Sequence, residues 1–356
     1  MTMSILDLPN IHKYNNKLSS KFIDVMSSTE NIELFASASM RAMVEIKWPL
    51  VKQAMTKNLF YPYLLFLGLF IIYADFIFEY FQENNLAESE FKWELGNPEF
   101  WIRNSKEILR IVLLSLAGYF LLISFRSFVV QGPARYLTNP WRYIDIIPLA
   151  TIIFALLFEY FTSDYPQFER AVNGLSAFLM WLKFLYFLRM YRQSSKFISM
   201  IVAVISDMKI FLLVFLVSLI TFSQSMYIIS NNNEPEHRFI SSIWDSLLFT
   251  YNISLGSWDV TGFGEANKFI MITLFLMSTL FLCIIMLNLL IAVISDTYAR
   301  VNESSQNELY RNFADLIVEN EFLIPASLIE EHDKKGTYLY IAKVDQSEVI
   351  GDQMEL

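Results

Sequence analysis

Long apolar runs separated by short polar links make up most of this chain. Six runs lie at about 59–81, 105–130, 143–162, 171–191, 209–230 and 268–298. Each is long enough to cross a hydrocarbon core as a helix, which takes about 20 residues. The runs are continuous in Leu, Ile and Phe and lack the alternation of a lipid-facing barrel strand. The pattern predicts an all-α membrane protein with six transmembrane helices.

A shorter apolar segment lies between the fifth and sixth runs. It reads SSIWDSLLFTYNISLGSWDVTGF, from Ser241 to Phe263, and it ends in Gly, Ser and Asp. Non-helical backbone is tolerated at membrane depth only where protein or water surrounds it, because an unpaired peptide group in lipid is costly. The segment therefore predicts a re-entrant pore loop, a short helix and turn beside an aqueous cavity. A structured extracellular loop is the alternative.

The turn of this segment, SLGSWD, is the candidate selectivity filter. Gly256 lets the backbone approach a central axis, and Asp259 is a candidate for a ring of carboxylates that favours cations. One such loop cannot enclose a pore, whereas several copies around a closed symmetry axis can. The filter residues that we predict are Ser254, Leu255, Gly256, Ser257 and Asp259.

The sixth run is longer than a bilayer requires, so we expect it to continue as a helix into the cytoplasm. Its lower part, LNLLIAVISDTY, contains Asn288, a polar group that should face protein or the water path. Ile291 and Ile294 are candidates for a hydrophobic constriction that gates by dewetting. Ordinary helix packing is the alternative for the two isoleucines.

The charges on the fourth run indicate whether this chain senses voltage. Steep voltage gating uses about three to four charges per subunit on an Arg-rich fourth helix. Here only Lys183 lies in the middle of the run, and Arg189 and Arg192 lie at its end. We therefore expect weak voltage dependence. Asp145, near the start of the third run, is expected to pair with Arg189 or Arg192 in a structural contact.

Composition and charge agree with a membrane channel and fix its orientation. The chain is 54% hydrophobic and only 18% charged, against about 25% charged residues in a soluble domain. Fourteen Lys and Arg residues lie on the side of the two ends and four on the other side, which places both termini in the cytoplasm. The outer loops are acidic and would concentrate cations, although ordinary solvated loops are the alternative.

The sequence offers no candidate catalytic, cofactor or metal site. Cys283 is the single cysteine, and His12, His237 and His332 lie far apart. We therefore expect no enzyme, no resident metal or cofactor and no nucleic-acid partner. A secondary transporter should show inverted repeats with matching interruptions, but only one interrupted region is present.

Three stretches together resemble the transmembrane domain of transient receptor potential (TRP) cation channels, in particular the TRP-like ion-transport proteins of ciliates. They are YLTNPWRYIDIIPL, the stretch that begins WLKFLYFLRMYRQSSKF, and LNLLIAVISDTYARV. The resemblance implies a homotetramer in the plasma or ciliary membrane. It also implies a voltage-sensor-like four-helix domain and a pore domain exchanged between neighbours. It implies permeation by Na⁺, K⁺ and often Ca²⁺, with the filter at SLGSWD and the lower gate at Ile291.

The sequence also departs from that family. Arg126 and Arg142 stand where relatives with an intramembrane Ca²⁺ site have acids or amides, so we predict no such site. No repeat with the ankyrin period of about 33 residues is present. The expected function is a tetrameric non-selective cation channel of TRP-like type that is permeable to Ca²⁺ and weakly voltage-dependent. A non-conducting structural or accessory subunit that retains the channel fold is the alternative.

The predicted division of the chain has five parts. In the N-terminal segment we expect one or two helices that end near Trp48–Pro49. In the C-terminal tail we expect an acidic helix, followed by little regular structure beyond Pro325. The parts are a cytoplasmic N-terminal segment (1–58), a sensor-like four-helix domain (59–191), a linker helix (192–208), a pore domain (209–298) and a cytoplasmic tail (299–356).

Overall fold

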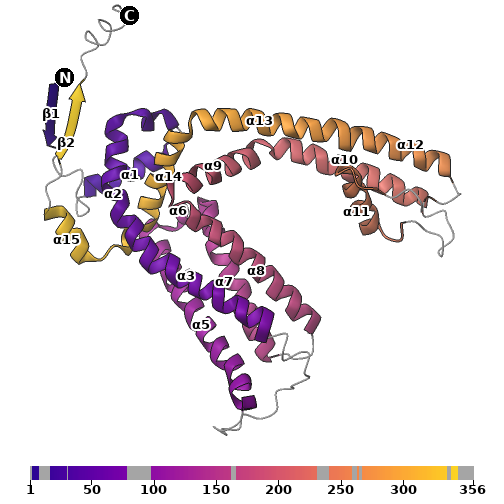
Figure 1. Cartoon of the computed structure of the whole chain (residues 1–356), viewed down its shortest axis with the longest axis horizontal. Helices are drawn as coiled ribbons and strands as arrows, with labels where there is room; N and C mark the ends of the chain where they lie inside the picture. Colours follow the sequence, from indigo (N-terminus) through magenta and orange to yellow (C-terminus); the bar gives the residue numbers. More distant parts are fainter. Residues whose placement is uncertain are drawn as a thin grey trace, which may run out of the picture. The chain divides into compact units, whose positions relative to one another are not determined.

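A computed structural model describes residues 2–7, 17–29, 31–77, 98–161, 166–230, 240–258, 263, 267–334 and 338–343 (Figure 1). The chain divides into two compact units. The bundle unit comprises residues 1–196 and 306–356, and the hairpin unit comprises residues 197–305.

Four long helical segments form the core of the bundle unit. The first is continuous through α2 (Ala38–Met55), η2 (Thr56–Phe60), α3 (Tyr61–Ile71) and η3 (Ile72–Ile77), of which η2 and η3 are π-helical. The others are α5 (Pro98–Gln131), α7 (Pro140–Phe161) and α8 (Pro166–Leu188), with the short α6 (Pro133–Thr138) between α5 and α7.

The first helix does not end at the Trp48–Pro49 pair, contrary to our expectation. Pro49 lies inside α2, where it removes one backbone hydrogen bond. Val44, Trp48 and Val51 on either side are buried in the core of the bundle unit. Burial of these side chains on both sides of the proline explains why the helix continues through it.

The N-terminal part of the bundle unit adds α1 (Lys17–Ser28) and the 3₁₀-helix η1 (Ile32–Ala36). The tail adds α14 (Ser305–Asn320), the 3₁₀-helix η6 (Glu321–Leu323) and α15 (Ala326–Lys334). The expectation of little regular structure beyond Pro325 was therefore wrong, since α15 and a strand follow that residue. The acidic helix expected at the start of the tail is present as α14.

The two ends of the chain meet in a small sheet. Strands β1 (Thr2–Asp7) and β2 (Tyr338–Lys343) pair antiparallel, with Thr2 opposite Lys343 and Asp7 opposite Tyr338. Two paired strands must lie on the same side of a membrane, so an even number of crossings separates them. The sheet is thus compatible with six spans and lies outside the helical membrane region.

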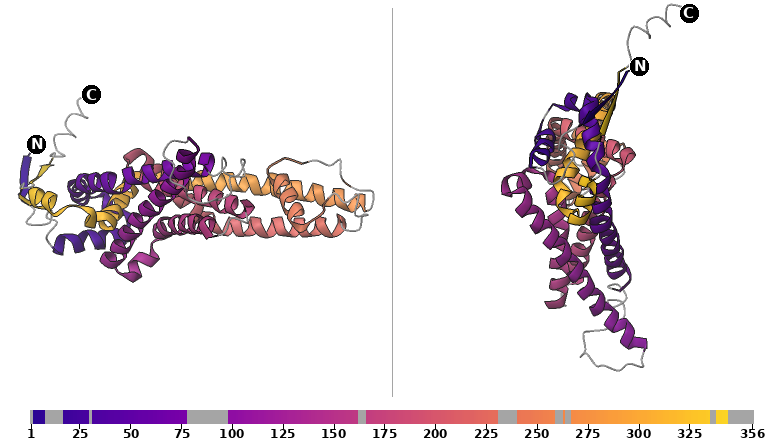
Figure 2. Two further views of the ribbon diagram at one scale, coloured as in Figure 1. Left: turned by 90° about the horizontal axis from the view of Figure 1, so that it is seen from below. Right: turned by 90° about the vertical axis from the view of Figure 1, so that its left-hand side faces the viewer.

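The hairpin unit contains two long antiparallel helices with a short helix packed against both (Figures 1 and 2). The linker helix α9 (Arg192–Asp207) begins within the bundle range and leads to α10 (Lys209–Ser230). After the short α11 (Ile243–Ser254), the chain returns through α12 (Lys268–Ser278), the π-helical η5 (Thr279–Met286) and α13 (Leu287–Glu303).

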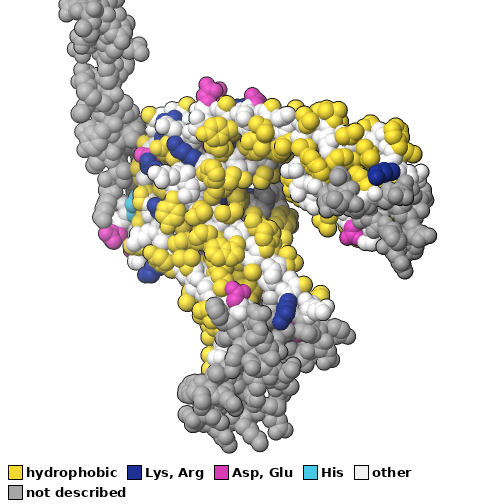
Figure 3. Space-filling model, turned by 45° about the vertical axis from the view of Figure 1, so that its right-hand side comes forward, with side chains coloured by type: hydrophobic (Ala, Val, Ile, Leu, Met, Phe, Trp, Pro, Cys, Tyr) yellow, Lys and Arg dark blue, Asp and Glu magenta, His cyan; other side chains and the backbone are white. Residues whose placement is uncertain are grey.

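Six helical segments of the described chain are long and apolar enough to cross a membrane, as the sequence predicts. They are Ala38–Asp75, Asn104–Gln131, Trp141–Tyr160, Gln167–Leu188, Lys209–Ser230 and Lys268–Glu303. Hydrophobic side chains cover long stretches of these helices, as the space-filling view in Figure 3 shows. The last segment extends to Glu303, which agrees with the expected continuation of the sixth run.

The tail helix α14 is held in the bundle unit by its apolar face. Phe313 is 1% exposed and stacks on Trp48, with ring centroids 4.3 Å apart and planes 10° from parallel. Leu309, Leu316 and Ile317 on the same face are buried as well. The contact joins the tail to the helix that begins the first span.

We predict that Phe313→Ala weakens the docking of α14 by about 3 to 5 kcal/mol, the usual cost of removing a buried aromatic ring. Hydrogen–deuterium exchange of the α14 amides measures this loss as faster exchange. Gln306→Ala is the matched control, because Gln306 is exposed on the same helix and loses only a solvent-exposed hydrogen bond from Arg41. It should change docking by about 1 kcal/mol or less. Equal exchange in the two variants would contradict the role of the stack.

Candidate functional site

The short helix α11 is fixed at its start by side-chain hydrogen bonds. Ser242 is its N-cap and accepts from the backbone N–H of Trp244 at 3.2 Å. Asp245 in the first turn accepts from the hydroxyl of Ser241. A carboxylate suits this position because a helix N-terminus carries partial positive charge.

Small hydroxyl residues line the buried face of α11. Ser246, Thr250 and Ser254 follow one another at four-residue spacing and are at most 3% exposed. The Ser246 hydroxyl donates to the backbone oxygen of Ser223 on α10 at 2.6 Å. Such residues let helices approach closely in a membrane and satisfy their own polar groups. The stripe therefore anchors α11 to α10.

Gly256 forms the C-terminal cap of α11. Its φ of 82° is left-handed, a conformation that glycine adopts without steric cost. The N–H of Ser257 donates to the Asn252 oxygen at 2.9 Å, and the N–H of Gly256 donates to the Ile253 oxygen at 3.0 Å. These two bonds constitute a Schellman motif, which satisfies helix carbonyls that would otherwise lack donors.

The predicted filter residues divide between buried and exposed positions. Ser254 is buried, whereas Leu255, Gly256 and Ser257 are exposed in the single chain. A Cβ added at Gly256 would lie 3.9 Å from the Cys283 Sγ in η5, so the turn lies beside the last long helix. Asp259 lies outside the described residues.

The predicted gate residues lie on α13. Asn288, Ile291 and Ile294 occupy successive turns, and all three are exposed in the single chain. Lower on the same helix, Thr297 donates to Asp207 at 3.0 Å and Arg300 pairs with the same carboxylate. The end of α9 is therefore bonded to the lower end of α13 within the hairpin unit.

In the bundle unit, Asp145 does not pair with Arg189 or Arg192, contrary to our expectation. It pairs with Arg142, one turn away on α7, at 3.2 Å, and with Lys183 on α8 at 3.4 Å. Lys183 is 3% exposed and lies over the rings of Tyr63 and Phe120. A buried ammonium without a charged partner is costly, and Asp145 supplies that partner to Lys183.

The two arginines at the end of the fourth run have other partners. Arg189 is 3% exposed, stacks over Trp141 with its Cζ 4.3 Å from the ring centroid, and donates to Asn312 at 3.1 Å. Arg192 pairs with Glu45 at 2.9 Å. Both contacts lie within the bundle unit, and the partner of Arg189 lies on α14.

Sequence reasoning missed Glu319 on α14, whose carboxylate joins the tail helix to the charged cluster around Arg142 and Asp145. Its carboxylate is 5% exposed and accepts from Tyr186 at 2.9 Å and from Asn139 at 2.6 Å. Arg142 lies 3.7 Å from the same carboxylate. The apolar spacing of Phe313, Leu316 and Ile317 is the sequence signal that could have indicated a docked tail helix.

The described geometry of the hairpin unit is thus a short capped helix between two long candidate membrane helices. The bundle unit, taken by itself, is a four-helix bundle with paired internal charges. Comparison with known families identifies the same region. Residues 158–301 match the polycystin cation channel family. This range includes α8 to α12, η5 and all but the last two residues of α13. The match to the polycystin cation channel family therefore covers the short helix and nearly all of both flanking long helices.

Several relatives show the same similarity at low identity. A transient receptor potential cation channel subfamily A member 1 homolog from Caenorhabditis elegans is 24% identical over 324 residues, which cover 84% of this chain and 26% of that protein. Polycystin-2-like protein 2 from Mus musculus is 22% identical over 291 residues, 79% of this chain and 43% of that protein. Polycystin-2-like protein 1 from Homo sapiens is 22% identical over 194 residues, 48% of this chain and 24% of that protein.

The chain therefore spans less than half the length of each of these relatives. The expected resemblance to TRP channels is confirmed at the level of the TRP and polycystin transmembrane region. The narrower likeness to ciliate TRP-like proteins stays a prediction. The match is to an ion-channel family and not to an enzyme.

We predict that acidification tightens the docking of α14. Burial, together with the Glu319 carboxylate, raises the pKa of Asp315 to about 7, although Arg189, Arg311 and Arg135 act to lower it. Because the folded pKa is above the unfolded value, the stabilising protonated form is lost as pH rises through about 7. Docking should strengthen by at most about 1.4 kcal/mol between pH 8 and pH 6.

Hydrogen–deuterium exchange of α14 at several pH values measures this change, after correction for the intrinsic exchange rate. Asp315→Asn should remove most of the pH dependence, because the amide is neutral throughout. An undiminished dependence in that variant would assign the titration to another group.

Proposed function

We propose that this chain forms a homotetrameric, non-selective cation channel that conducts Na⁺, K⁺ and Ca²⁺ and depends weakly on voltage. One observation carries the proposal: α11 ends in a glycine-capped turn between two long membrane helices, in a segment that matches the polycystin cation channel family. A short helix and turn at membrane depth needs water or protein around it, and copies around an axis supply both.

The exposed residues of the turn and of α13 support this assignment. Leu255, Gly256 and Ser257 follow the C-terminal end of α11, whose carbonyl dipoles favour a cation. Asn288, Ile291 and Ile294 leave a face of α13 uncovered in the single chain. In the proposed tetramer the turn is the filter and this face of α13 is the gate.

The charges of the bundle unit support weak voltage dependence. Lys183, the only mid-helix charge of α8 (Pro166–Leu188), is paired with Asp145, and Arg189 and Arg192 have their own partners. Moving one charge through the full membrane potential contributes about 2.3 kcal/mol per 100 mV. A single paired lysine therefore gives a shallow voltage response.

The orientation and the division of the chain belong to the same proposal. The excess of Lys and Arg on the side of the chain ends supports cytoplasmic termini, and the pairing of β1 with β2 supports ends on one side. We assign residues 59–191 to a sensor-like domain, 209–298 to the pore, and the protein to the plasma or ciliary membrane.

The experiment that tests the proposal combines assembly and conduction. Purified protein in nanodiscs should have the mass of four chains, and in planar bilayers it should pass Na⁺, K⁺ and Ca²⁺ with a shallow slope of open probability against voltage. A stable monomer or dimer would contradict the pore. A well-folded tetramer that stays silent under all tested conditions would favour a non-conducting accessory subunit.

We predict that Asp259→Asn lowers Ca²⁺ permeability relative to Na⁺. Four carboxylates around an axis attract a divalent ion more than a monovalent ion, because the Coulomb energy scales with ionic charge. The measurement is the reversal potential under bi-ionic Ca²⁺ and Na⁺ conditions. This assignment comes from the sequence, since Asp259 lies outside the described residues.

Asp245→Asn is the control variant. Asp245 accepts from Ser241 at the start of α11, far along the helix from the proposed filter, and should leave the reversal potential nearly unchanged. If Asp245→Asn moves the potential and Asp259→Asn does not, the filter assignment is wrong. If neither moves it, the Asp259 assignment is wrong and backbone oxygens near Gly256 set selectivity.

A further inference from the structure

A second charged cluster lies at the opposite end of the bundle unit from Glu319, where α5 begins and α7 ends. Glu159 on α7 accepts from the Tyr73 hydroxyl and lies 2.8 Å from Lys106 and 3.4 Å from Arg110 on α5. Glu107 also binds Arg110, at 2.8 Å and 3.0 Å. Two cations and two carboxylates therefore meet here, so the cluster has no net charge.

Two members of this cluster, Glu107 and Arg110, form the polar end of a hollow between α5 and α7. The hollow has a volume of about 560 Å³ and is lined by Glu107, Arg110, Ile111, Leu114, Leu156, Leu157 and Tyr160. That volume lies within the usual range of ligand pockets, about 300 to 1,000 Å³. Its walls are otherwise aliphatic, and it lies between two candidate membrane spans, so lipid is the solvent that surrounds it.

The groups at the polar end are suited to a headgroup that carries both charges. The Tyr160 ring is 58% exposed and Glu107 is 36% exposed, and an aromatic ring beside a carboxylate attracts a quaternary or primary ammonium. Arg110 lies behind them, 5.7 Å from the Tyr160 ring centroid. Its Nε has no hydrogen-bond acceptor among the described residues, and a guanidinium is a favoured partner of phosphate.

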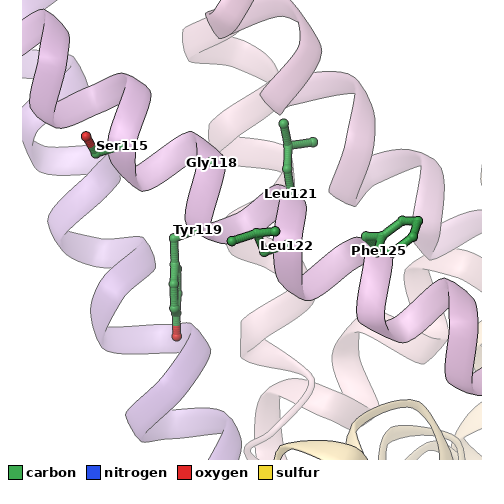
Figure 4. Close-up of a pocket in the computed structure, with 6 residues that line it drawn as sticks. All are labelled: Ser115, Gly118, Tyr119, Leu121, Leu122 and Phe125. Carbon is green, nitrogen blue, oxygen red and sulfur yellow. The ribbon is translucent and has the colours of Figure 1, made fainter.

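A second hollow, on α5, lacks these features and provides a comparison. It is lined by Ser115, Gly118, Tyr119, Leu121, Leu122 and Phe125, whose side chains project from one helix in Figure 4. The Ser115 hydroxyl donates to the Ile111 oxygen and the Tyr119 hydroxyl donates to the Asn58 oxygen. Its lining carries no charged group, so it has no means of selecting a headgroup.

We propose that the hollow between α5 and α7 binds one zwitterionic phospholipid. The ammonium of the headgroup contacts Glu107 and Tyr160, the phosphate faces Arg110, and one acyl chain lies along Ile111, Leu114 and Leu157. Charge complementarity decides the occupant. The hollow presents one carboxylate, Glu107, and one guanidinium, Arg110, and this pair matches a zwitterion better than an anion. The site does not depend on whether the chain conducts ions.

The test is lipid retention by the full chain. Protein is reconstituted in nanodiscs that hold equimolar phosphatidylcholine and phosphatidylglycerol, extracted into detergent, and analysed by native mass spectrometry for phospholipids retained per chain. We expect one retained phosphatidylcholine per chain, at about fivefold or more over phosphatidylglycerol. Equal retention of the two lipids, or retention of neither, would overturn the proposal.

Two substitutions separate filling of the hollow from headgroup recognition. Ile111→Trp fills the hollow and should reduce retained phosphatidylcholine by about fivefold or more. The matched control is Ile108→Trp, because Ile108 is exposed one turn away on the same helix and does not line the hollow. An equal loss in both variants would show that the lipid is not held in this hollow.

Glu107→Gln should reverse the preference toward phosphatidylglycerol. Removal of one carboxylate leaves an excess positive charge beside the headgroup, which favours an anion. Only variants with the same elution volume and melting temperature as the parent protein are compared. The readout is the ratio of retained phosphatidylcholine to retained phosphatidylglycerol, which does not depend on the amount of folded protein. A ratio that stays at the parent value would refute recognition by these charges.

Discussion

The constraint that shapes this protein is that a polar group in a membrane must find its partner within the protein. The helix backbone, the capped turn and the hydroxyl groups of the short helix follow this constraint. The backbone is helical throughout the six candidate spans. At the C-terminal end of the short helix α11, the backbone N–H groups of Gly256 and Ser257 bond to helix carbonyls. The hydroxyl residues Ser246 and Thr250 donate to backbone oxygens.

The same constraint explains how charges are distributed in the bundle unit. Lys183 is almost fully buried and has Asp145 beside it, and Glu319 brings a carboxylate to Arg142. Removing one member of a buried pair leaves an uncompensated charge, which is far costlier than losing an exposed contact. These pairs therefore fix the rotation of the helices relative to one another, whatever they contribute to net stability.

The spans and the short helix could be predicted from sequence, because both follow from the length of apolar runs. The partner of Asp145 could not, since the depth of a residue along its helix does not give the direction in which its side chain points. Depth alone suggested Arg189 or Arg192, whereas the rotation of α7 and α8 brings Lys183 to Asp145. The docking of Phe313 on Trp48 joins residues far apart in sequence, and no local pattern in the first span reveals it.

Gly256 bears on both the proposed pore and the end of α11. The sequence suggested that glycine allows the backbone to approach a pore axis, whereas the structure gives it a local role, since its φ of 82° closes the Schellman motif of α11. The two roles are connected. The cap fixes the position at which the helix must end, and so determines that Leu255, Ser257 and Trp258 are the exposed residues of the turn. In the proposed pore, the conformational need of the helix terminus sets which backbone groups face the ion path, and permeation then depends on the residues that follow the turn.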